Sequence, residues 1–476
     1  MFTNLFSVFA LVFLAACAPL PAKPGFDSVQ TLLRPRLTQE ISWRQTAQER
    51  RDLGASVTTQ LNAPLTLEAA LGIGLINNPR LQASYEKLGM SYGDLVQAGL
   101  PVNPSLGLSW RSSAVGVEHG FTLVQDFLSL LTLAPRKRMA DGAFEQTKLA
   151  TAQQVLELAT EVKKAYFSVA AESQVLDLVR SSTDAANATG DLAQRQQLAG
   201  NINKRELALQ QEFAARAMLE LSRQELVLAE SREHLSALLG LSSAQREWSL
   251  ASINVEPNDL SYELASLESK AVTERFDVAA ARKNIDVVAD SLGVASQYRY
   301  LSVLGLGVSY ERMSDGERLR GPSLELGLPL WDRGQGKRMR MEAELRESQA
   351  KLEALTLDII GNLRNAHARL NNSQRSAQHF RDTLLPLHER IVAETLKFYN
   401  GMLLGVYDLL LARQNQLNAR RDYVGTIKAY WLARADLEYA VGGGELGATM
   451  PKPAMEPKPE PPQAPAPDMP ATHKHH

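Results

Sequence analysis

The residue types that most often perform chemistry are scarce in this sequence. Three mid-chain histidines, His367, His379 and His388, lie in a predicted helical region, and His119 and His234 stand alone. Histidines with polar neighbours on a helix are more often solvated than bound to a metal. The sequence contains no phosphate-binding loop, zinc-protease motif or nucleophile elbow. We therefore expect no catalytic residue, no metal site and no bound cofactor.

The single cysteine, Cys17, could carry a covalent modification. It follows the apolar segment FSVFALVFLAA, residues 6–16, which is too short to span a membrane and is typical of a signal peptide. The sequence LAAC resembles a bacterial lipobox, which implies removal of residues 1–16 and a lipid on Cys17. Ala18 follows the cysteine, and by the rule for Gram-negative lipoproteins this implies the outer membrane. The alternative is an ordinary signal peptide with an incidental cysteine.

Composition argues against a nucleic-acid-binding protein and against a protein that spans a membrane with helices. A formal net charge of −2 over 476 residues gives no electrostatic reason to expect nucleic acid as a partner. Hydrophobic residues make up 45% of the chain and aromatic residues only 6%, with much Ala and Leu, which suits long helices. No later segment approaches the roughly 20 apolar residues of a spanning helix, so any membrane crossing must use strands.

The sequence repeats itself after about 200 residues. Arg338 stands 200 residues after Arg138 in the same strand-to-helix transition, and LGLSW (106–110) matches LGVSY (306–310). This period is too long for a solenoid and indicates two copies of one unit. The predicted divisions are a signal peptide (1–16), a lipidated N-terminal segment (17–64), a first unit (65–250), a second unit (258–443) and a disordered Pro-rich tail (444–476).

Each unit is predicted to begin with a helix, over 66–99 or 262–297, followed by two strands. In the second unit the strict alternation of apolar and polar residues is typical of a strand with one apolar face, as a transmembrane strand requires. A soluble hairpin with one buried face is the alternative. Aromatic residues near strand ends suggest a membrane-interface girdle, and cations should lie just below the bilayer. The alternating leucines are Leu324, Leu326, Leu328 and Leu330; the interface residues are Trp110, Tyr310, Trp331, Arg136, Lys137, Arg138, Lys337 and Arg338.

Long helices should follow each hairpin. Apolar residues recur every seven positions, as at Val155, Val162 and Val169, which indicates coiled-coil packing. A helix over 137–195 would measure roughly 85 Å and must project from the rest of the molecule. Gly200 in one stretch, and Gly401 with Gly405 in the other, mark the turns of two helical hairpins. Pro386 should kink the second hairpin partway along.

Two hairpins supply four strands, which cannot close a barrel, and an open strand edge is not stable in lipid. The smallest bacterial outer-membrane barrels have about 8 strands. We therefore predict a homotrimer with 3 × 4 = 12 strands around one axis. The predicted fold is mainly α with a transmembrane β-barrel, in which duplicated helix–β-hairpin–long-helix units form a 12-stranded outer-membrane barrel and a long periplasmic α-helical barrel.

The ordered elements resemble the TolC-like outer-membrane efflux family over about residues 60–443. Matching segments are NNPRLQAS (77–84), LELGLPLWDRGQGKR (324–338) and FYNGMLLGVYDLLLARQ (398–414). The resemblance implies the passive duct of a tripartite efflux pump, whose periplasmic adaptor and inner-membrane transporter are separate proteins. It also implies that the chain is not an enzyme and that outer-membrane lipid surrounds the strands.

The resemblance also assigns roles to the hairpin tips. An acidic ring just after the second turn would constrict the pore at Asp408, with Glu206 at the duplicate position, although Leu411 stands where family channels can carry a second aspartate. The resemblance places the adaptor contacts at the two turns, on Gly200, Asn201, Ile202, Leu404, Gly405 and Val406. The alternatives are that the Asp408 carboxylate is exposed outside the pore and that the turns have no docking role.

The cargo is the least determined property. The segment YNGMLLGVYDLLLAR is more similar to the heavy-metal branch of the family than to the drug-efflux branch, and the tail from Met450 carries Met and His residues that suit copper or zinc. We expect export of metal cations through a duct for which this tail is dispensable. Drug efflux and type I protein secretion are the alternatives, followed by a periplasmic coiled-coil scaffold without a pore.

Overall fold

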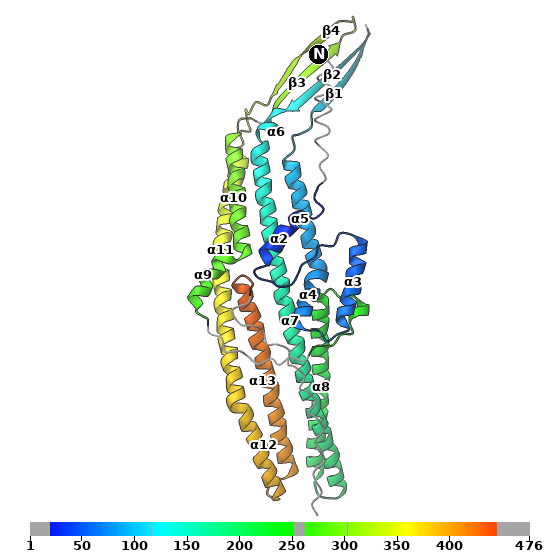
Figure 1. Cartoon of the computed structure of the whole chain (residues 1–476), viewed down its shortest axis with the longest axis vertical. Helices are drawn as coiled ribbons and strands as arrows, with labels where there is room; N and C mark the ends of the chain where they lie inside the picture. Colours follow the sequence, from blue (N-terminus) through cyan, green and yellow to red (C-terminus); the bar gives the residue numbers. More distant parts are fainter. Residues whose placement is uncertain (1–19, 115, 252–261, 302, 445–476) are drawn as a thin grey trace, which may run out of the picture.

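The computed structural model of the chain describes residues 20–114, 116–251, 262–301 and 303–444. This part of the chain forms a long rod, with a four-stranded sheet at one end and the turns of two helical hairpins at the other (Figure 1). Cys17 and residues 445–476 of the predicted tail lie outside the described residues.

The two predicted units have the same order of elements. An N-terminal segment with α2 (Phe26–Leu33) and α3 (Ala47–Leu61) precedes them. The first unit contains α4 (Leu67–Asn77), α5 (Pro79–Ala98), β1 (Ser105–Ser113), β2 (Gly116–Asp126), α6 (Phe127–Leu131), α7 (Leu133–Leu198), α8 (Lys204–Leu238) and the 3-10 turn η1 (Ser243–Gln245). The second contains α9 (Leu264–Glu274), α10 (Phe276–Gln297), β3 (Leu304–Arg312), β4 (Arg318–Leu326), α11 (Gln335–His379), the π-helical segment η2 (Phe380–Leu384), α12 (Leu385–Asn400) and α13 (Val406–Ala440).

The helices lie side by side in one layer, and the layer is four helices wide at both ends of the rod. Near the sheet the neighbours are α5, α7, α10 and α11, and near the turns they are α8, α7, α13 and α12 (Figure 1). Helix α7 extends over 66 residues, about 99 Å at about 1.5 Å per residue. Because α7 contacts α10 and α13, it also joins the first unit to the second.

The first helix of each unit is broken, where the sequence predicted one continuous helix. Asn78 leaves the helical conformation between α4 and α5, because Pro79 disfavours helical geometry in the residue before it. Its side chain caps α5 and also donates to the carbonyl of Leu238 at the end of α8. Arg275 occupies the equivalent break between α9 and α10 and donates to the carbonyls of Tyr439 and Ala440.

The predicted kink at Pro386 takes the form of a π-helical segment, η2, immediately before α12. Proline has no N–H to donate to the carbonyl of Asp382, and its ring crowds that carbonyl. A wider turn relieves the contact without ending the helical path.

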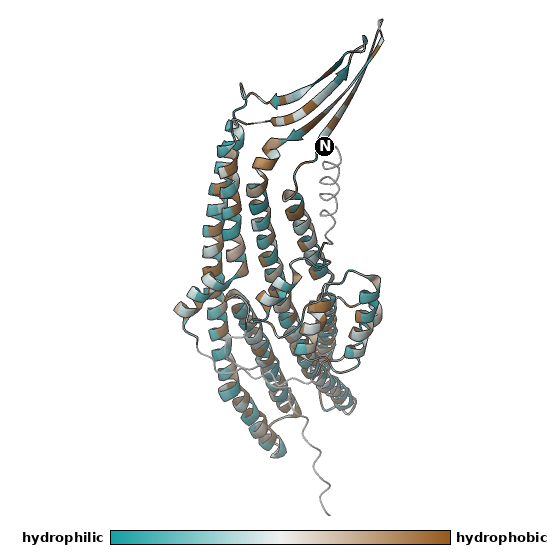
Figure 2. Ribbon diagram, turned by 45° about the horizontal axis from the view of Figure 1, so that its top comes forward, coloured by the Kyte–Doolittle hydropathy of each residue, from teal (hydrophilic) through white to brown (hydrophobic). Residues whose placement is uncertain are grey.

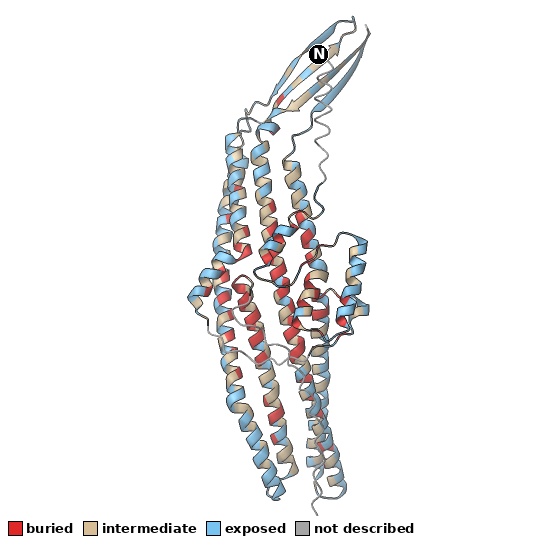
Figure 3. Ribbon diagram, in the orientation of Figure 1, coloured by how far each residue is buried: buried red, intermediate tan, exposed pale blue. Residues whose placement is uncertain are grey.

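The buried core lies at mid-height on the rod, where the N-terminal segment packs against the long helices (Figure 3). Trp43 from this segment lies with Phe26 and Tyr85 in an aromatic cluster, with ring centroids 5.2–6.4 Å apart. Phe167 of α7 stacks on Trp431 of α13 at 4.7 Å. The first cluster holds the N-terminal segment against the first unit, and the Phe167–Trp431 stack holds the two units together at the middle of the rod.

Two arginines of the N-terminal segment contact the two units at equivalent places. Arg44 donates to the carbonyl of Asn77, directly before the break in the first unit, at 2.9 Å. Arg36 donates to the carbonyl of Glu274, directly before the break in the second, at 2.5 Å. Arg36 also donates to the carbonyl of Gly442 at 2.6 Å. The segment therefore fastens both helix breaks.

Candidate functional site

The sheet has one apolar face that is open in the single chain. Its order is β1-β2-β3-β4, with every neighbouring pair antiparallel. The register places apolar side chains opposite one another across all four strands, each between 40 and 69% exposed, and Figure 2 shows apolar stretches along the strands. They are Leu106, Leu108, Trp110, Phe121, Leu123, Leu306, Val308, Leu324 and Leu326.

The opposite face is polar and rich in small residues. Arg111 and Glu311 form an ion pair there at 3.3 Å. A side chain at Gly307 would meet the carbonyl oxygen of Leu123 and lie 2.7 Å from the hydroxyl of Ser323. The neighbouring strands therefore leave no room for a side chain at this position. A sheet with one apolar and one polar face can separate lipid from water. The other glycines on this face are Gly107, Gly116, Gly120, Gly305 and Gly321.

The outer strands β1 and β4 each pair with one neighbour only, among the described residues. Each therefore presents an unpaired row of backbone donors and acceptors. The single chain cannot satisfy these groups in an apolar environment, whereas other copies of the same sheet could.

The predicted interface residues lie at two different heights. Trp110 is inside β1 and 69% exposed, and Tyr310 of β3 stacks on Phe121 at 5.4 Å. Trp331 is five residues beyond the end of β4 and 88% exposed, on the side of the sheet that leads to α11. The ladder ends at Gly327, because Pro329 has no N–H to continue it. Leu328 and Leu330 consequently lie outside the strand, contrary to the predicted alternation.

The predicted cations lie in the first turns of the two helices that follow the sheet. Lys137 and Arg138 are exposed in α7, and Arg136 donates to the carbonyl of Ser129 at 2.9 Å. In α11, Lys337 is exposed and Arg338 pairs with Glu342 at 2.7 Å. A positive charge near a helix N-terminus opposes the helix dipole. Helix stability therefore does not explain why cations gather at this level.

The first hairpin tip turns through Gly200, whose φ of 76° is left-handed. Asn201 donates its backbone N–H to the carbonyl of Gln196, which closes the end of α7. Asn203 then caps α8 and exchanges hydrogen bonds with Glu206 in a capping box. Ile202 is half-buried between these caps.

The second tip turns at a residue that the sequence did not mark. The left-handed position is Met402, with a φ of 58°, whereas Gly401 and Gly405 have negative φ values of −79° and −78°. Gly405 is the N-cap of α13, equivalent to Asn203, and its N–H donates to Asp408 at 3.0 Å. Leu404 is exposed and Val406 half-buried beside it.

The structure places Glu206 and Asp408 at equivalent positions on different hairpins. Each is exposed, in the third position of its helix, and accepts the N–H of its own N-cap residue. Tyr407 joins the two tips by donating to the Gln196 side chain at 2.6 Å. Burial raises the pKa of Tyr407, and the nearby charge of Glu206 raises it further. One chain supplies a single carboxylate from each tip, and a ring would need several chains.

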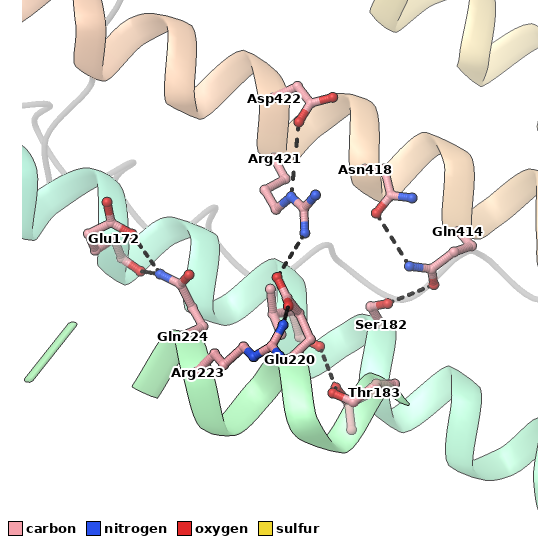
Figure 4. Close-up of polar contacts among 12 residues, drawn as sticks. Glu172, Ser182, Thr183, Glu220, Arg223, Gln224, Gln414, Asn418, Arg421 and Asp422 are labelled. Atoms are coloured by element: carbon pink, nitrogen blue, oxygen red, sulfur yellow. Dashed lines mark hydrogen bonds and ion pairs between the residues drawn. The ribbon is translucent and has the colours of Figure 1, made fainter. Parts of the chain in front are cut away.

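A polar network connects the two hairpins along a groove of about 820 Å³ over α7, between α8 and α13 (Figure 4). Arg421 of α13 reaches Glu220 of α8 at 3.2 Å. Glu172 of α7 accepts from Lys428 of α13 at 2.6 Å and from Gln224 of α8 at 2.7 Å. This network was not predicted from the sequence, because a heptad pattern does not reveal which helices of two hairpins are neighbours.

Within the described ranges, no three His, Cys, Asp or Glu side chains come together in a group suited to a metal ion. His367 lies 3.3 Å from the carbonyl of Tyr262. Among these residues, no helix has both the length and the hydropathy needed to cross a bilayer.

No family profile matches the chain. A cobalt-zinc-cadmium resistance protein, CzcC of Cupriavidus metallidurans, is 27% identical over 390 residues, which cover 80% of this chain and 90% of that protein.

Solved structures with the same fold are more distant in sequence. The outer membrane protein VceC of Vibrio cholerae has a TM-score of 0.63 at 20% identity, over 79% of this chain and 96% of VceC. The open outer membrane channel MtrE of Neisseria gonorrhoeae has a TM-score of 0.65 at 15% identity, over 79% of this chain and 89% of MtrE. These matches confirm the fold that the sequence predicted, a mainly α architecture with a strand domain.

Proposed function

We propose that this chain, a relative of the TolC-like outer-membrane efflux proteins that has their fold, is the outer-membrane duct of a tripartite efflux system. The observation that carries the proposal is the amphipathic four-stranded sheet at one end of a helical layer whose longest helix, α7, measures about 99 Å. An exposed apolar face of this size is unfavourable in water and suited to lipid. A coiled-coil scaffold without a pore would have no use for such a face.

The duct is a homotrimer in this proposal. Three sheets supply 3 × 4 = 12 strands, and pairing β4 of one copy with β1 of the next would remove both open edges. The helical layer has open edges too. Leu226 of α8 is 59% exposed, and Ile391 of α12 is 42% exposed, so these two edges offer apolar surface to neighbouring copies.

We also propose a lipid on Cys17, which would attach the chain to the membrane in addition to the inserted strands. The LAAC sequence supports this modification. Residues 1–16 would then be absent from the mature protein, and intact-mass measurement should show the acyl chains on a new N-terminal cysteine.

The hairpin tips are the proposed contacts for a periplasmic adaptor, at the six residues named from the sequence. The position of the turns supports this proposal, because they lie at the end of the rod farthest from the sheet (Figure 1). The acidic ring of Asp408, with Glu206, is proposed to constrict this end. Both carboxylates are exposed one turn inside the tips, where three copies could converge.

The proposed cargo is a divalent heavy-metal cation, exported without chemistry in this chain. Support comes from the relative CzcC, whose name records cobalt, zinc and cadmium resistance, and from the Met- and His-bearing tail. Organic toxic compounds and type I protein secretion are the other candidates, because such a duct does not itself select the cargo.

One experiment tests both the duct and its cargo. Deleting the gene should lower tolerance to cobalt, zinc and cadmium more than tolerance to dyes and antibiotics. The wild-type gene and Ser109→Arg, on the polar face, should restore tolerance. Leu106→Arg, on the apolar face in the mid-strand row of Leu123 and Val308, should not, because a charge facing mid-membrane lipid costs about 2–4 kcal/mol. Full rescue by Leu106→Arg would contradict insertion of the sheet. Sensitivity to organic compounds alone would contradict the metal cargo.

A further inference from the structure

Three arginines form a cluster at the end of the sheet farthest from the helices. Arg312 of β3 is directly opposite Arg318 of β4, and Arg320 is opposite Tyr310. All three arginines are exposed. The alternation of the strands places them on the apolar face. Arg312 and Arg318 are in the row of Trp110, and Arg320 is in the row of Phe121.

The cluster is unfavourable without a partner. Like charges directly opposite each other in a sheet repel, and His119, across from Arg312 on β2, is another basic group on the same face. No ion pair to any of the three arginines is found among the described residues. Four carboxylates lie near this end. Glu118 and Glu311 alternate onto the polar face, where Glu311 pairs with Arg111. Asp315 and Glu317 lie in the turn between β3 and β4, where Asp315 accepts the backbone N–H of Glu317.

The height of the cluster indicates where its partner lies. From Leu304 to Arg312 the strand rises about 26 Å, at about 3.3 Å per residue. Strand tilt reduces this height, while exposed Leu328 and Leu330 continue the apolar surface toward the helices. The apolar band of an outer-membrane barrel is about 25 Å tall. The arginines therefore lie at the outer rim of that band, where lipid headgroups begin.

We infer that Arg312, Arg318 and Arg320 bind phosphate groups of the outer-leaflet lipid, a phosphorylated disaccharide lipid of the lipid A type. Guanidinium groups match phosphate oxygens with paired hydrogen bonds, and a doubly phosphorylated headgroup can contact more than one arginine. Neutralising the repulsion would stabilise the hairpin of β3 and β4. This inference rests on the proposed outer-membrane placement of the sheet.

The test compares two triple variants of the full-length protein, purified in detergent. R312Q/R318Q/R320Q removes the cluster, and R340Q/R346Q/R375Q removes three exposed arginines of α11 as the matched control. Native mass spectrometry would measure binding of bisphosphorylated lipid A, the same lipid without phosphates, phosphatidylglycerol and inorganic phosphate. We expect the cluster variant to bind bisphosphorylated lipid A about tenfold to a hundredfold more weakly, and the control variant to bind like wild type.

Each other outcome overturns the inference in a distinguishable way. Equal binding by wild type and the cluster variant, or equal binding of lipid A with and without phosphates, removes the arginine–phosphate contact. If phosphatidylglycerol binds as tightly as lipid A, the ligand is not specifically an outer-leaflet lipid. If inorganic phosphate binds as tightly as lipid A, the site recognises phosphate and not a lipid. If wild type binds none of the lipids and carbonate extracts it from membranes, the proposed function fails as well.

Discussion

At the scale of single residues, the two arginines of the N-terminal segment have separable effects. Arg36→Ala would leave the carbonyls of Glu274 and Gly442 without their donor, at a cost of about 1–2 kcal/mol for a half-buried site. Hydrogen–deuterium exchange should rise around residues 270–276 and 438–444. Arg44→Ala should raise exchange around residues 76–80 instead.

Arg34 provides the control, because it is exposed and lies two residues before Arg36. Arg34→Ala should leave exchange unchanged at both breaks. If hydrogen–deuterium exchange in Arg36→Ala were the same as in Arg34→Ala, the N-terminal segment would cover the helix breaks without stabilising them.

Asp408 has two roles that a conservative change can separate. Asparagine keeps a side-chain oxygen for the N–H of Gly405 and removes the charge, so Asp408→Asn should preserve the helix cap. If three copies converge on the pore, single-channel cation selectivity and divalent-cation block should fall roughly several-fold. Glu212→Gln, exposed and paired with Arg216 on α8, is the control. Unchanged selectivity in Asp408→Asn would place its carboxylate outside the pore.

At the scale of elements, the two hairpin tips respond differently to substitution. Gly200→Ala should destabilise its turn by about 1 kcal/mol, because Gly200 is left-handed. Gly405 has an extended conformation, so Gly405→Trp adds bulk at the tip without backbone strain. If the tip docks an adaptor, Gly405→Trp should abolish export and leave the assembled protein intact.

The control for Gly405→Trp is Gly54→Trp in α3, where an added side chain meets nothing within 4 Å. It should preserve both export and assembly. Normal metal tolerance in the Gly405→Trp strain would argue against docking at this turn.

The elements themselves were largely predictable from the sequence, and their ends and partners were not. Heptads and the absence of proline predicted α7, and alternation predicted β4. The left-handed Met402 escaped prediction because glycine, the usual residue for that geometry, occurs on both sides of it. The breaks at Asn78 and Arg275 were missed because hydrophobic periodicity continues across them, although Pro79 was a local signal.

At the scale of the whole molecule, the open edges predict a trimer. Unpaired edges of β1 and β4 are unfavourable in lipid, and the apolar edges of α8 and α12 are unfavourable in water. Native mass spectrometry of the purified protein should therefore give the mass of three chains. The double variant Leu226→Glu with Ile391→Glu should weaken the assembly, because it places charge on both helical edges. Leu20→Glu, at a 64% exposed residue of the N-terminal segment, should leave the trimer unchanged. A stable wild-type monomer with an inserted sheet would exclude the 12-stranded arrangement, since four strands leave two edges open to lipid.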